Sequence, residues 1–298
     1  MTVIGEQKEN ARYAAAIGFF DGVHIGHRCL IAETLRVAAE SGLTPAVFTF
    51  DASSSYKGMP LLITEDEKER LFFSYGIKTL FCVDFREIAD LSPEAFVSDV
   101  LKRELHVECA VVGEGFRYGC HASGSVATLA SAIRTVAVPP VTAYGVTVSS
   151  TEIRRAVTDG DMERATVMLS RPFSLSGEVL HGKALGKSLG FPTLNLSFPR
   201  GMLLPRCGVY ASRVMLSGKE YAAVTNIGVR PSVENTACPN IESHLIDACG
   251  DFYGEIARVE LLHFLRAEQK FPSLDALRHA IGEDTENVRK WMNRSIHS

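Results

Sequence analysis

The chain has 298 residues, of which 46% are hydrophobic and 22% are charged, and its formal net charge is −4. This composition indicates a soluble globular protein, and the slightly negative charge gives no reason to expect nucleic acid as a partner. The length favours two domains, each large enough to bury a core of its own.

The spacing of the cysteines and the length of the apolar runs indicate the cellular compartment of the protein. The seven cysteines stand at positions 29, 82, 109, 120, 207, 238 and 249 without a C-x-x-C pair. Neither a zinc site nor a disulfide framework is therefore indicated. The starting segment MTVIGEQKEN is polar, and no later apolar run approaches the ~20 residues of a membrane span. We expect a cytoplasmic protein with reduced thiols and no membrane partner.

In the first half of the chain, apolar strand-like runs alternate with amphipathic helices, which predicts a parallel sheet. Strands are expected at 14–20, 44–50, 77–85, 107–112 and 135–138. Helices are expected at 27–40, from the cap Thr64 to near Gly76, from Ser92 and Pro93 onward, at 125–133, and after Ser149. Gly42 is expected to close the first of these helices, and Thr64 with Glu67 to form a capping box.

Near residue 172 the pattern changes. From Ser174 onward the segments are strand-length and separated by turn residues, and only the last twenty-odd residues are helical. This succession of short strands and turns, followed by one helix, predicts a small antiparallel barrel with a terminal helix. We therefore expect one domain over residues 1–172 and a second over 173–298.

The segment HGKALGKSLGFPTLN, residues 181–195, is rich in glycine and lysine but is not a P-loop. Gly177 to Lys183 has the required spacing but is followed by Ala184. Before Gly186-Lys187-Ser188, Gly182 stands one residue too close. Gly190-Phe191-Pro192 then breaks the helix that a P-loop requires.

The segment GFFDGVHIGH, residues 18–27, follows the first predicted strand and begins a helix. A helix N-terminus offers free N–H groups and a positive dipole end, and His24 and His27 can donate hydrogen bonds to a phosphate. Glycines let the backbone approach closely. A surface turn with incidental histidines is the alternative. We assign to nucleotide binding, besides the histidines, Gly18, Phe19, Asp21, Gly22 and Gly26.

The segment VSSTEIRRAV, residues 148–157, supports this assignment. Ser149, Ser150 and Thr151 cap a predicted helix that carries Arg154 in its first turn, an arrangement suited to phosphate oxygens. Alone it indicates only a cap. Together the two segments resemble the nucleotidyltransferase superfamily. In that superfamily H-x-G-H and S-S-T-x-x-R bind the triphosphate of ATP from opposite sides of a Rossmann-like sheet.

The second half resembles the riboflavin kinase module in the order and spacing of its motifs. These motifs are GKALGKSLGFPTLN, GVYASRV, NIGVRPS, ESHLID with DFYG, and LRAEQKFPSLDAL. Such a module behind an H-x-G-H domain is similar to the bacterial bifunctional riboflavin kinase/FMN adenylyltransferase family, also called FAD synthetase. The resemblance implies an α/β Rossmann-like nucleotidyltransferase domain followed by a small antiparallel β-barrel with a C-terminal helix.

By this resemblance, the glycine-rich segment covers ATP, and Gly182, Lys183, Gly186, Lys187 and Gly190 bind it. The following turn would hold Mg²⁺ and the phosphates, with Thr193 and Asn195 as oxygen ligands. The family's usual P-T-A-N reads P-T-L-N here, a change that removes no ligand. Taken alone, this motif would indicate only a turn.

The resemblance also assigns Glu242 as the general base for the 5′-hydroxyl of riboflavin, and Arg266, Phe271 and Arg117 to flavin binding. In a strand at 241–246, Glu242 and His244 share one face while Ile241, Ser243 and Leu245 share the other. A lone glutamate on a barrel is more often a solvated charge. Lys187, Arg206 and Arg230 could add positive charge nearby or lie on the surface.

Two departures from the family pattern lie in the first domain. The family commonly has F-x-P-H-P after the second strand, where this chain has Phe50-Asp51-Ala52-Ser53-Ser54. Gly115 stands in GEGFRYG where the family has Asp or Asn before the phenylalanine. These changes predict slower FAD formation or weaker flavin affinity, with both histidines retained.

Three functions stay open from the sequence. The first is a bifunctional enzyme that converts riboflavin and ATP into FMN and then FMN and ATP into FAD. The second is a riboflavin kinase whose first domain has weakened, and the third is a non-catalytic flavin-binding module. We expect the first, with the second as the alternative, because the third leaves the metal turn and Glu242 unexplained. The expected partners are small molecules: riboflavin, FMN and ATP.

Overall fold

The computed structural model describes residues 1–6, 10–51, 59–181, 190–231, 237–248 and 250–295. The chain forms two compact units, Met1–Ser150 and Thr151–Ser298, and each is described by itself. The change from helices to strands expected between residues 172 and 173 falls inside the second unit, which begins with two helices. Residues 1–172 and 173–298 stay our proposal for the two functional domains.

The first unit is built on a twisted sheet, most of it parallel. All five expected strands are present, and they lie in the spatial order β4, β3, β2, β5, β8. Their bounds are β2 (Tyr13–Ile17), β3 (Thr44–Phe50), β4 (Thr79–Val83), β5 (Val107–Gly113) and β8 (Arg134–Val138). A further strand, β1 (Thr2–Gly5), pairs antiparallel with β4 and was not expected, because its segment looked polar.

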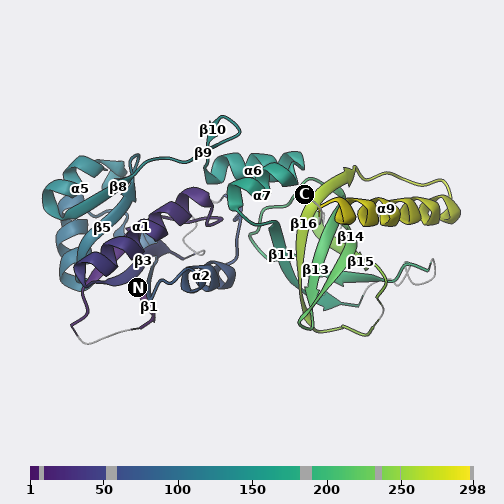
Figure 1. Ribbon diagram of the computed structural model, residues 1–298, viewed down its shortest axis with the longest axis horizontal. Helices are drawn as coiled ribbons and strands as arrows, with labels where there is room; N and C mark the ends of the chain where they lie inside the picture. Colours follow the sequence, from purple (N-terminus) through teal and green to yellow (C-terminus); the bar gives the residue numbers. More distant parts are fainter. Residues whose placement is uncertain (7–9, 52–58, 182–189, 232–236, 249, 296–298) are drawn as a thin grey trace. The chain divides into compact units, whose positions relative to one another are not determined.

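Helices cover both faces of this sheet (Figure 1). Leu30 and Ile31 of α1 (Ile25–Ser41) and Phe72 of α2 (Glu65–Ser74) pack on one face. The other face is covered by η3 (Phe96–Glu104), a π-helix that continues α4 (Pro93–Ala95), and by α5 (Val126–Ala132). The unit therefore has the doubly wound architecture of Rossmann-like folds.

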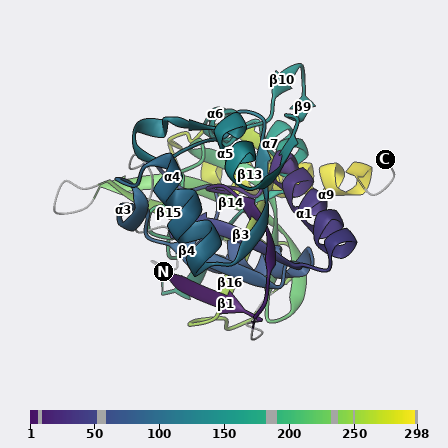
Figure 2. The same ribbon diagram turned by 90° about the vertical axis from the view of Figure 1, so that its left-hand side faces the viewer.

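Short elements complete the first unit. They are α3 (Phe85–Ile88), β6 (Arg117–Tyr118), η4 (Cys120–Ala122), β7 (Gly124–Ser125), β9 (Thr142–Ala143) and β10 (Val146–Thr147). β9 and β10 form a hairpin that projects away from the sheet (Figures 1 and 2).

Local capping signals explain where the helices begin and end. Thr64 caps α2 by accepting a hydrogen bond from the Glu67 N–H at 3.4 Å, and Ser92 caps α4 with Pro93 following it. Gly42 ends α1 with φ 67°. The cap at Ser92, the end of α1 at Gly42 and the Thr64 half of the expected capping box agree with the sequence prediction.

Two boundaries at the start of the chain differ from the expectation. The strand expected at 14–20 ends at Ile17, because the backbone turns at Phe20, where φ is 55°. The helix expected from residue 27 begins at Ile25, because the His24 side chain serves as its N-cap. Both differences arise in the segment predicted to bind nucleotide.

The second unit contains a closed antiparallel barrel, as expected. Its strands close in the order β11, β12, β15, β14, β13, β16, so the barrel has no free edge. They are β11 (Phe173–Leu180), β12 (Thr193–Leu196), β13 (Gly208–Leu216), β14 (Lys219–Pro231), β15 (Ala237–Leu245) and β16 (Ile256–Arg266). The helices are α6 (Ser150–Asp159), α7 (Met162–Leu169) and the expected terminal helix α9 (Leu274–Ser295).

The barrel interior combines apolar packing with a short chain of buried hydroxyls. Ser212 and Thr225 lie 2.6 Å apart and Thr225 and Ser243 2.8 Å apart, on three neighbouring strands. On β15, Ile241 and Leu245 are buried with Ser243, which leaves Glu242 on the opposite face as the alternation predicted.

Two negative findings concern the described residues. None of their helices combines the length and the apolar character that a membrane span requires. Five cysteines form no disulfide: Cys29, Cys82, Cys109, Cys120 and Cys207.

Gly177 allows β12 to close onto β11, and this gives a stability prediction. A Cβ at Gly177 would lie 2.1 Å from the Ser197 carbonyl oxygen, so the strand end must move. We expect Gly177→Ala to lower the free energy of unfolding by about 1–3 kcal/mol, measured by urea denaturation. Gly282→Ala is the control, because a Cβ there meets only the Phe191 ring, at 4.0 Å. Equal stability of the two variants would contradict the prediction.

Candidate functional sites

The first candidate site lies at the carboxyl end of β2. The chain runs from β2 outward to β3 and β4 and then returns to β5 on the other side of β2. The loops after β2 and β5 therefore leave the sheet at its topological switch point, where open α/β sheets bind ligands. Residues 18–24 form the loop after β2, and residues 25–27 are the first turn of α1.

The backbone of this loop takes unusual conformations. Phe20, Gly22 and Val23 all have positive φ, at 55°, 80° and 41°. A Cβ at Gly26 would lie 3.2 Å from the His24 ring, so a side chain there would press on the imidazole. The Gly18 N–H donates to the Phe48 carbonyl at 3.1 Å and thereby fixes the start of the loop.

His24 is buried and caps α1. Its Nδ1 accepts a hydrogen bond from the His27 N–H at 3.4 Å, so in the neutral ring the proton is on Nε2. The cap therefore fixes the tautomer, with the proton on Nε2 near the helix N-terminus.

His27 stacks on His24, with ring centroids 3.6 Å apart and an angle of 18° between the rings. Its Nδ1 is buried and has no hydrogen-bond partner among the described residues. Burial, followed by the charges of His24 and Lys68, holds the pKa of His27 well below its usual 6.5. The ring is therefore neutral near pH 7.

Lys68 also belongs to this site, although the sequence analysis missed it. Its ammonium is buried and donates to the Phe50 carbonyl at 3.0 Å and to Glu65 at 2.9 Å. It also lies 5.9 Å from the centre of the Phe19 ring. A lysine in an acidic helix reads as a solvated residue, so only its position on the buried face of α2 could have indicated this role.

Asp21 and Ser150 connect the loop to its surroundings. The Asp21 carboxylate accepts from the Leu62 N–H at 2.9 Å, and its carbonyl accepts from the Ser150 hydroxyl at 2.9 Å. The segment that contains Ser149 and Ser150 is thus brought to residues 18–27. Thr151 and Arg154 belong to the second unit, so their part in this site stays a proposal.

The loop after β5 carries the flavin residue expected in this unit. Arg117 is exposed in β6, four residues beyond the end of β5. A Cβ at Gly115 would meet nothing within 4 Å. The missing polar side chain therefore leaves open space at this edge of the sheet.

The second candidate site is a cavity of about 350 Å³ between the barrel and α9. Four residues predicted for the kinase site line it. Its walls are Thr193, Val209, Val224, Asn226, Glu242, His244, Arg266, Glu268, Gln269, Phe271, Leu277, Ile281 and Asp284.

Glu242 sits between two asparagines of neighbouring strands. Asn195 of β12 and Asn226 of β14 pair with it in the sheet register. The Asn240 amide donates to the Glu242 carboxylate at 3.0 Å and orients it. Asn195 does not line the cavity, but the register brings it beside Glu242.

Thr193 lines a second cavity as well as the first. This second cavity has a volume of about 390 Å³, and its walls are Val179, Pro192, Thr193, Leu194, Leu245, Ala248, Gly250, Asp251, Phe252 and Tyr253. Thr193 thus stands where the two cavities meet. His244 holds the adjoining turn, because its ring lies 3.0 Å from the Pro192 carbonyl oxygen.

Arg266 and Phe271 lie together at the other end of the first cavity, with the guanidinium carbon 5.6 Å from the ring centre. Asp284 of α9 holds this guanidinium through both carboxylate oxygens. Neither Asp284 nor Asn226 nor Glu268 was expected at the site. A carboxylate in an amphipathic helix carries no sequence signal that would have identified Asp284.

Some predicted residues are not at the cavity. Gly182, Lys183, Gly186 and Lys187 lie outside the described residues, as does the Arg230 side chain, whereas Gly190 is described with φ 86°. Arg206 lies over the Phe264 ring at 4.4 Å and donates to the Asp159 carbonyl, so it fastens α6 to the barrel.

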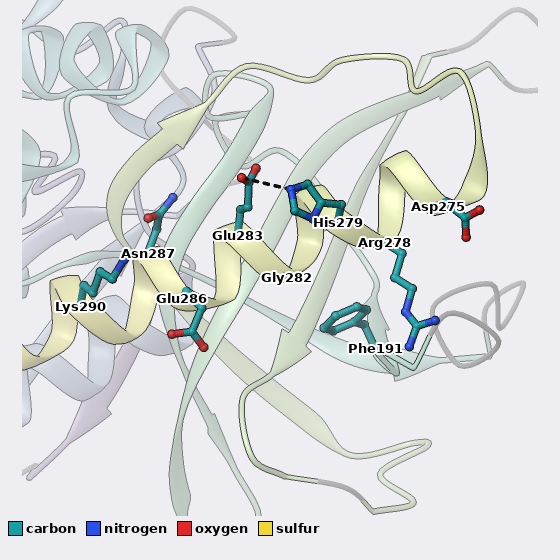
Figure 3. Close-up of a pocket in the computed structure, with 9 residues that line it drawn as sticks. All are labelled: Phe191, Asp275, Arg278, His279, Gly282, Glu283, Glu286, Asn287 and Lys290. Carbon is teal, nitrogen blue, oxygen red and sulfur yellow. Dashed lines mark ion pairs between the residues drawn. The ribbon is translucent and has the colours of Figure 1, made fainter.

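Another hollow, of about 820 Å³, runs along α9 and is also lined by Phe191 (Figure 3). None of its lining residues was predicted for a site. Its side chains are mostly charged and alternate in sign, as Glu283 and His279 do at 3.4 Å. This pattern is that of a solvated helix face.

No cluster of three His, Cys, Asp or Glu side chains suited to a metal occurs in the described parts.

Comparisons with known proteins match both units. A riboflavin kinase family model matches residues 169–292, and an FAD synthetase family model matches residues 6–152. Each half of the chain is therefore similar to a different enzyme family.

Three relatives are each described as a bifunctional riboflavin kinase/FMN adenylyltransferase. The protein from Listeria monocytogenes is 33% identical and covers 92% of this chain and 90% of its own length. The Bacillus subtilis protein is 32% identical, covering 96% and 95%. The Escherichia coli K12 protein is 35% identical, covering 92% and 91%.

A solved structure has the same fold. A crystal structure described as a macrolide-efflux protein from Streptococcus pneumoniae matches with a TM-score of 0.88 and 28% identity. It covers 95% of this chain and 96% of that one. That description concerns the other protein, and the fold alone is compared.

The lowered pKa of His27 gives a prediction about pH. In the unfolded chain His27 gains a proton near pH 6.5, whereas in the fold it does so only well below that value. Its contribution to stability is therefore complete above pH 6.5 and is lost as the pH falls toward the folded pKa. We expect the thermal unfolding midpoint of wild type to fall more steeply between pH 7 and pH 5 than that of His27→Gln. Parallel curves would contradict this.

Proposed function

The chain belongs to the bifunctional riboflavin kinase/FMN adenylyltransferase family, and from this premise we propose which residues carry out each reaction. It is an enzyme that phosphorylates riboflavin with ATP to give FMN, and that joins FMN to the adenylyl group of a second ATP to give FAD and pyrophosphate. Both family models match, and nothing in the comparisons favours a kinase alone.

The observation that carries the kinase assignment is the position of Thr193 between two cavities, one of which contains Glu242. We assign riboflavin to the Glu242 cavity and ATP to the cavity next to it. The phosphoryl group would then pass from one to the other beside Thr193. Such in-line positioning is most of what phosphoryl transfer requires.

Glu242 is proposed as the general base. Its carboxylate lines the acceptor cavity and is oriented by Asn240 at 3.0 Å. A primary alcohol is a poor nucleophile near neutral pH, so a carboxylate that accepts its proton assists the transfer. The non-catalytic alternative would leave this residue, and Thr193 beside it, without a purpose.

The chemistry of the donor set fits Mg²⁺. The Thr193 hydroxyl and the Asn195 amide oxygen are neutral hard ligands, and Asn195 pairs in register with the Glu242 carboxylate. Mg²⁺ favours such oxygen ligands together with water and phosphates. When bound there, it would neutralise charge on the transferred phosphoryl group.

For adenylyl transfer, we propose that phosphates bind at the N-terminus of α1. The Nε2–H of His24, the neutral ring of His27 and the Lys68 ammonium surround that end of the helix. The FMN phosphate that attacks is already anionic, so no base is needed, and donors that stabilise developing charge suffice.

Further residues are assigned to the same reaction. Gly18, Phe19, Asp21, Gly22 and Gly26 would shape the loop, and Ser149, Ser150, Thr151 and Arg154 would hold the triphosphate. A cytoplasmic location and small molecules as the partners, with neither nucleic acid nor membrane, stay proposals, and the net charge of −4 supports the exclusion of nucleic acid.

One experiment tests the function as a whole. Purified protein is incubated with riboflavin, ATP and Mg²⁺, and the flavins are separated by chromatography over time. FMN should appear first and FAD after it. FMN alone, even after long incubation with excess ATP, would favour the kinase with a weakened first domain.

His27→Ala should separate the two activities. Loss of a group that stabilises the transition state typically lowers a rate by about 10²–10³. We expect this loss for FAD formation from supplied FMN, while FMN formation from riboflavin stays near wild type. His121→Asn, an exposed histidine of the same unit, is the control. Equal loss of both activities would mean that His27 is structural or that the units are coupled.

Glu242→Gln should give the opposite separation. It preserves size and removes the base, so FMN formation should fall by about 10²–10⁴ while supplied FMN is still converted into FAD. Thr193→Ala should show the same pattern through weaker phosphate binding. Glu178→Gln, on the exposed face of β11, is the matched control. Riboflavin phosphorylation by Glu242→Gln at a near wild-type rate would exclude Glu242 as the base.

A further inference from the structure

Arg266 reaches the acceptor cavity from the last position of β16. Its guanidinium lines the cavity and lies 5.6 Å from the centre of the Phe271 ring. The Nη1 group donates to the Ala267 carbonyl at 3.3 Å. Arginine is a flexible side chain, so a fixed orientation at a binding site needs a partner that holds it.

Asp284 is that partner. Its carboxylate accepts from Arg266 Nε at 3.1 Å and from Nη2 at 2.7 Å, a fork-to-fork pair in which both groups are fixed in one plane. Only 7% of the Asp284 side chain is exposed. The pair therefore has little competition from water.

The position of Asp284 on α9 is unusual. Leu277 and Ile281 line the same cavity, and Val288 is fully buried, so Asp284 stands on the apolar face of the helix. A buried ion pair seldom stabilises a fold more than apolar residues would. Asp247 and Arg289, 2.5 Å apart at the surface, already connect α9 to the end of β15. Docking of the helix thus does not account for the buried pair.

The hydrogen bonds of Arg266 leave part of the guanidinium for a ligand. Three of its five N–H groups have partners among the described residues: two are directed to Asp284 and one to Ala267. The other two have no partner among the described residues, and Arg266 lines the cavity. A planar polar ligand such as a flavin ring offers carbonyl acceptors to such a fork.

We propose that Asp284 is a positioning residue for riboflavin phosphorylation, which holds the Arg266 guanidinium in the orientation that binds the flavin. The proposal rests on the assignment of this cavity to riboflavin. Asp284 acts through Arg266 and takes no part in proton transfer. Its removal should therefore weaken riboflavin binding and leave the chemical step nearly unchanged.

The test is steady-state kinetics of FMN formation by the full chain. Asp284→Asn keeps the shape but loses the ionic fork, so the KM for riboflavin should rise about tenfold or more. The kcat and the KM for ATP should stay within about threefold. Arg266→Lys should raise the same KM, and adding Asp284→Asn to it should have little further effect, because both changes remove one interaction.

Asp247→Asn is the matched control, since it breaks a different acid–arginine pair of α9, and it should leave all three parameters unchanged. If Asp284→Asn does not fold, Asp284→Glu retains the charge but displaces the guanidinium, and should show the same rise in KM. An unchanged riboflavin KM in a folded variant, or additive effects of the two substitutions, would overturn the proposal. A wild-type protein that forms no FMN would instead overturn the kinase assignment.

Discussion

Backbone N–H and C=O groups at the ends of strands and helices need hydrogen-bond partners, and at both sites the functional side chains provide them. The His24 ring accepts a hydrogen bond from the His27 N–H in the first turn of α1, and the Lys68 ammonium donates to the Phe50 carbonyl at the end of β3. In the barrel, His244 lies against the Pro192 carbonyl that precedes Thr193. The bonds that complete the fold therefore also fix the positions of the groups that we propose for phosphate binding.

The two sites differ in how they manage charge. In the first unit, burial keeps His27 neutral beside a stacked histidine, and the positive charge of the proposed phosphate site comes from the buried Lys68 ammonium. At the cavity between the barrel and α9, two carboxylates have different partners. Glu242 faces the cavity with a neutral amide beside it, whereas Asp284 is neutralised by Arg266. The proposed base and the proposed anchor of the guanidinium are thus different carboxylates in different surroundings.

The two departures from the family pattern can be related to their surroundings in the first unit. Gly115 leaves open space after β5, so the fold does not exclude a polar side chain there. The segment that lacks the usual histidine begins just after Phe50, whose carbonyl is bonded by Lys68. Positive charge is therefore retained at the end of β3 by a residue of another element.

The sequence by itself determined most of the longer strands and helices, several of their caps, the barrel, and the alternation that directs Glu242 away from the buried face of β15. These features depend on residues close together in the chain, so local periodicity reveals them. Only the tertiary structure decided that Lys68 is buried beside Phe19, that Thr193 borders two cavities, and that Asp284 holds Arg266. Each of these depends on contacts between distant elements, and a charged residue in a helix has the same local pattern whether it is solvated or paired in the interior.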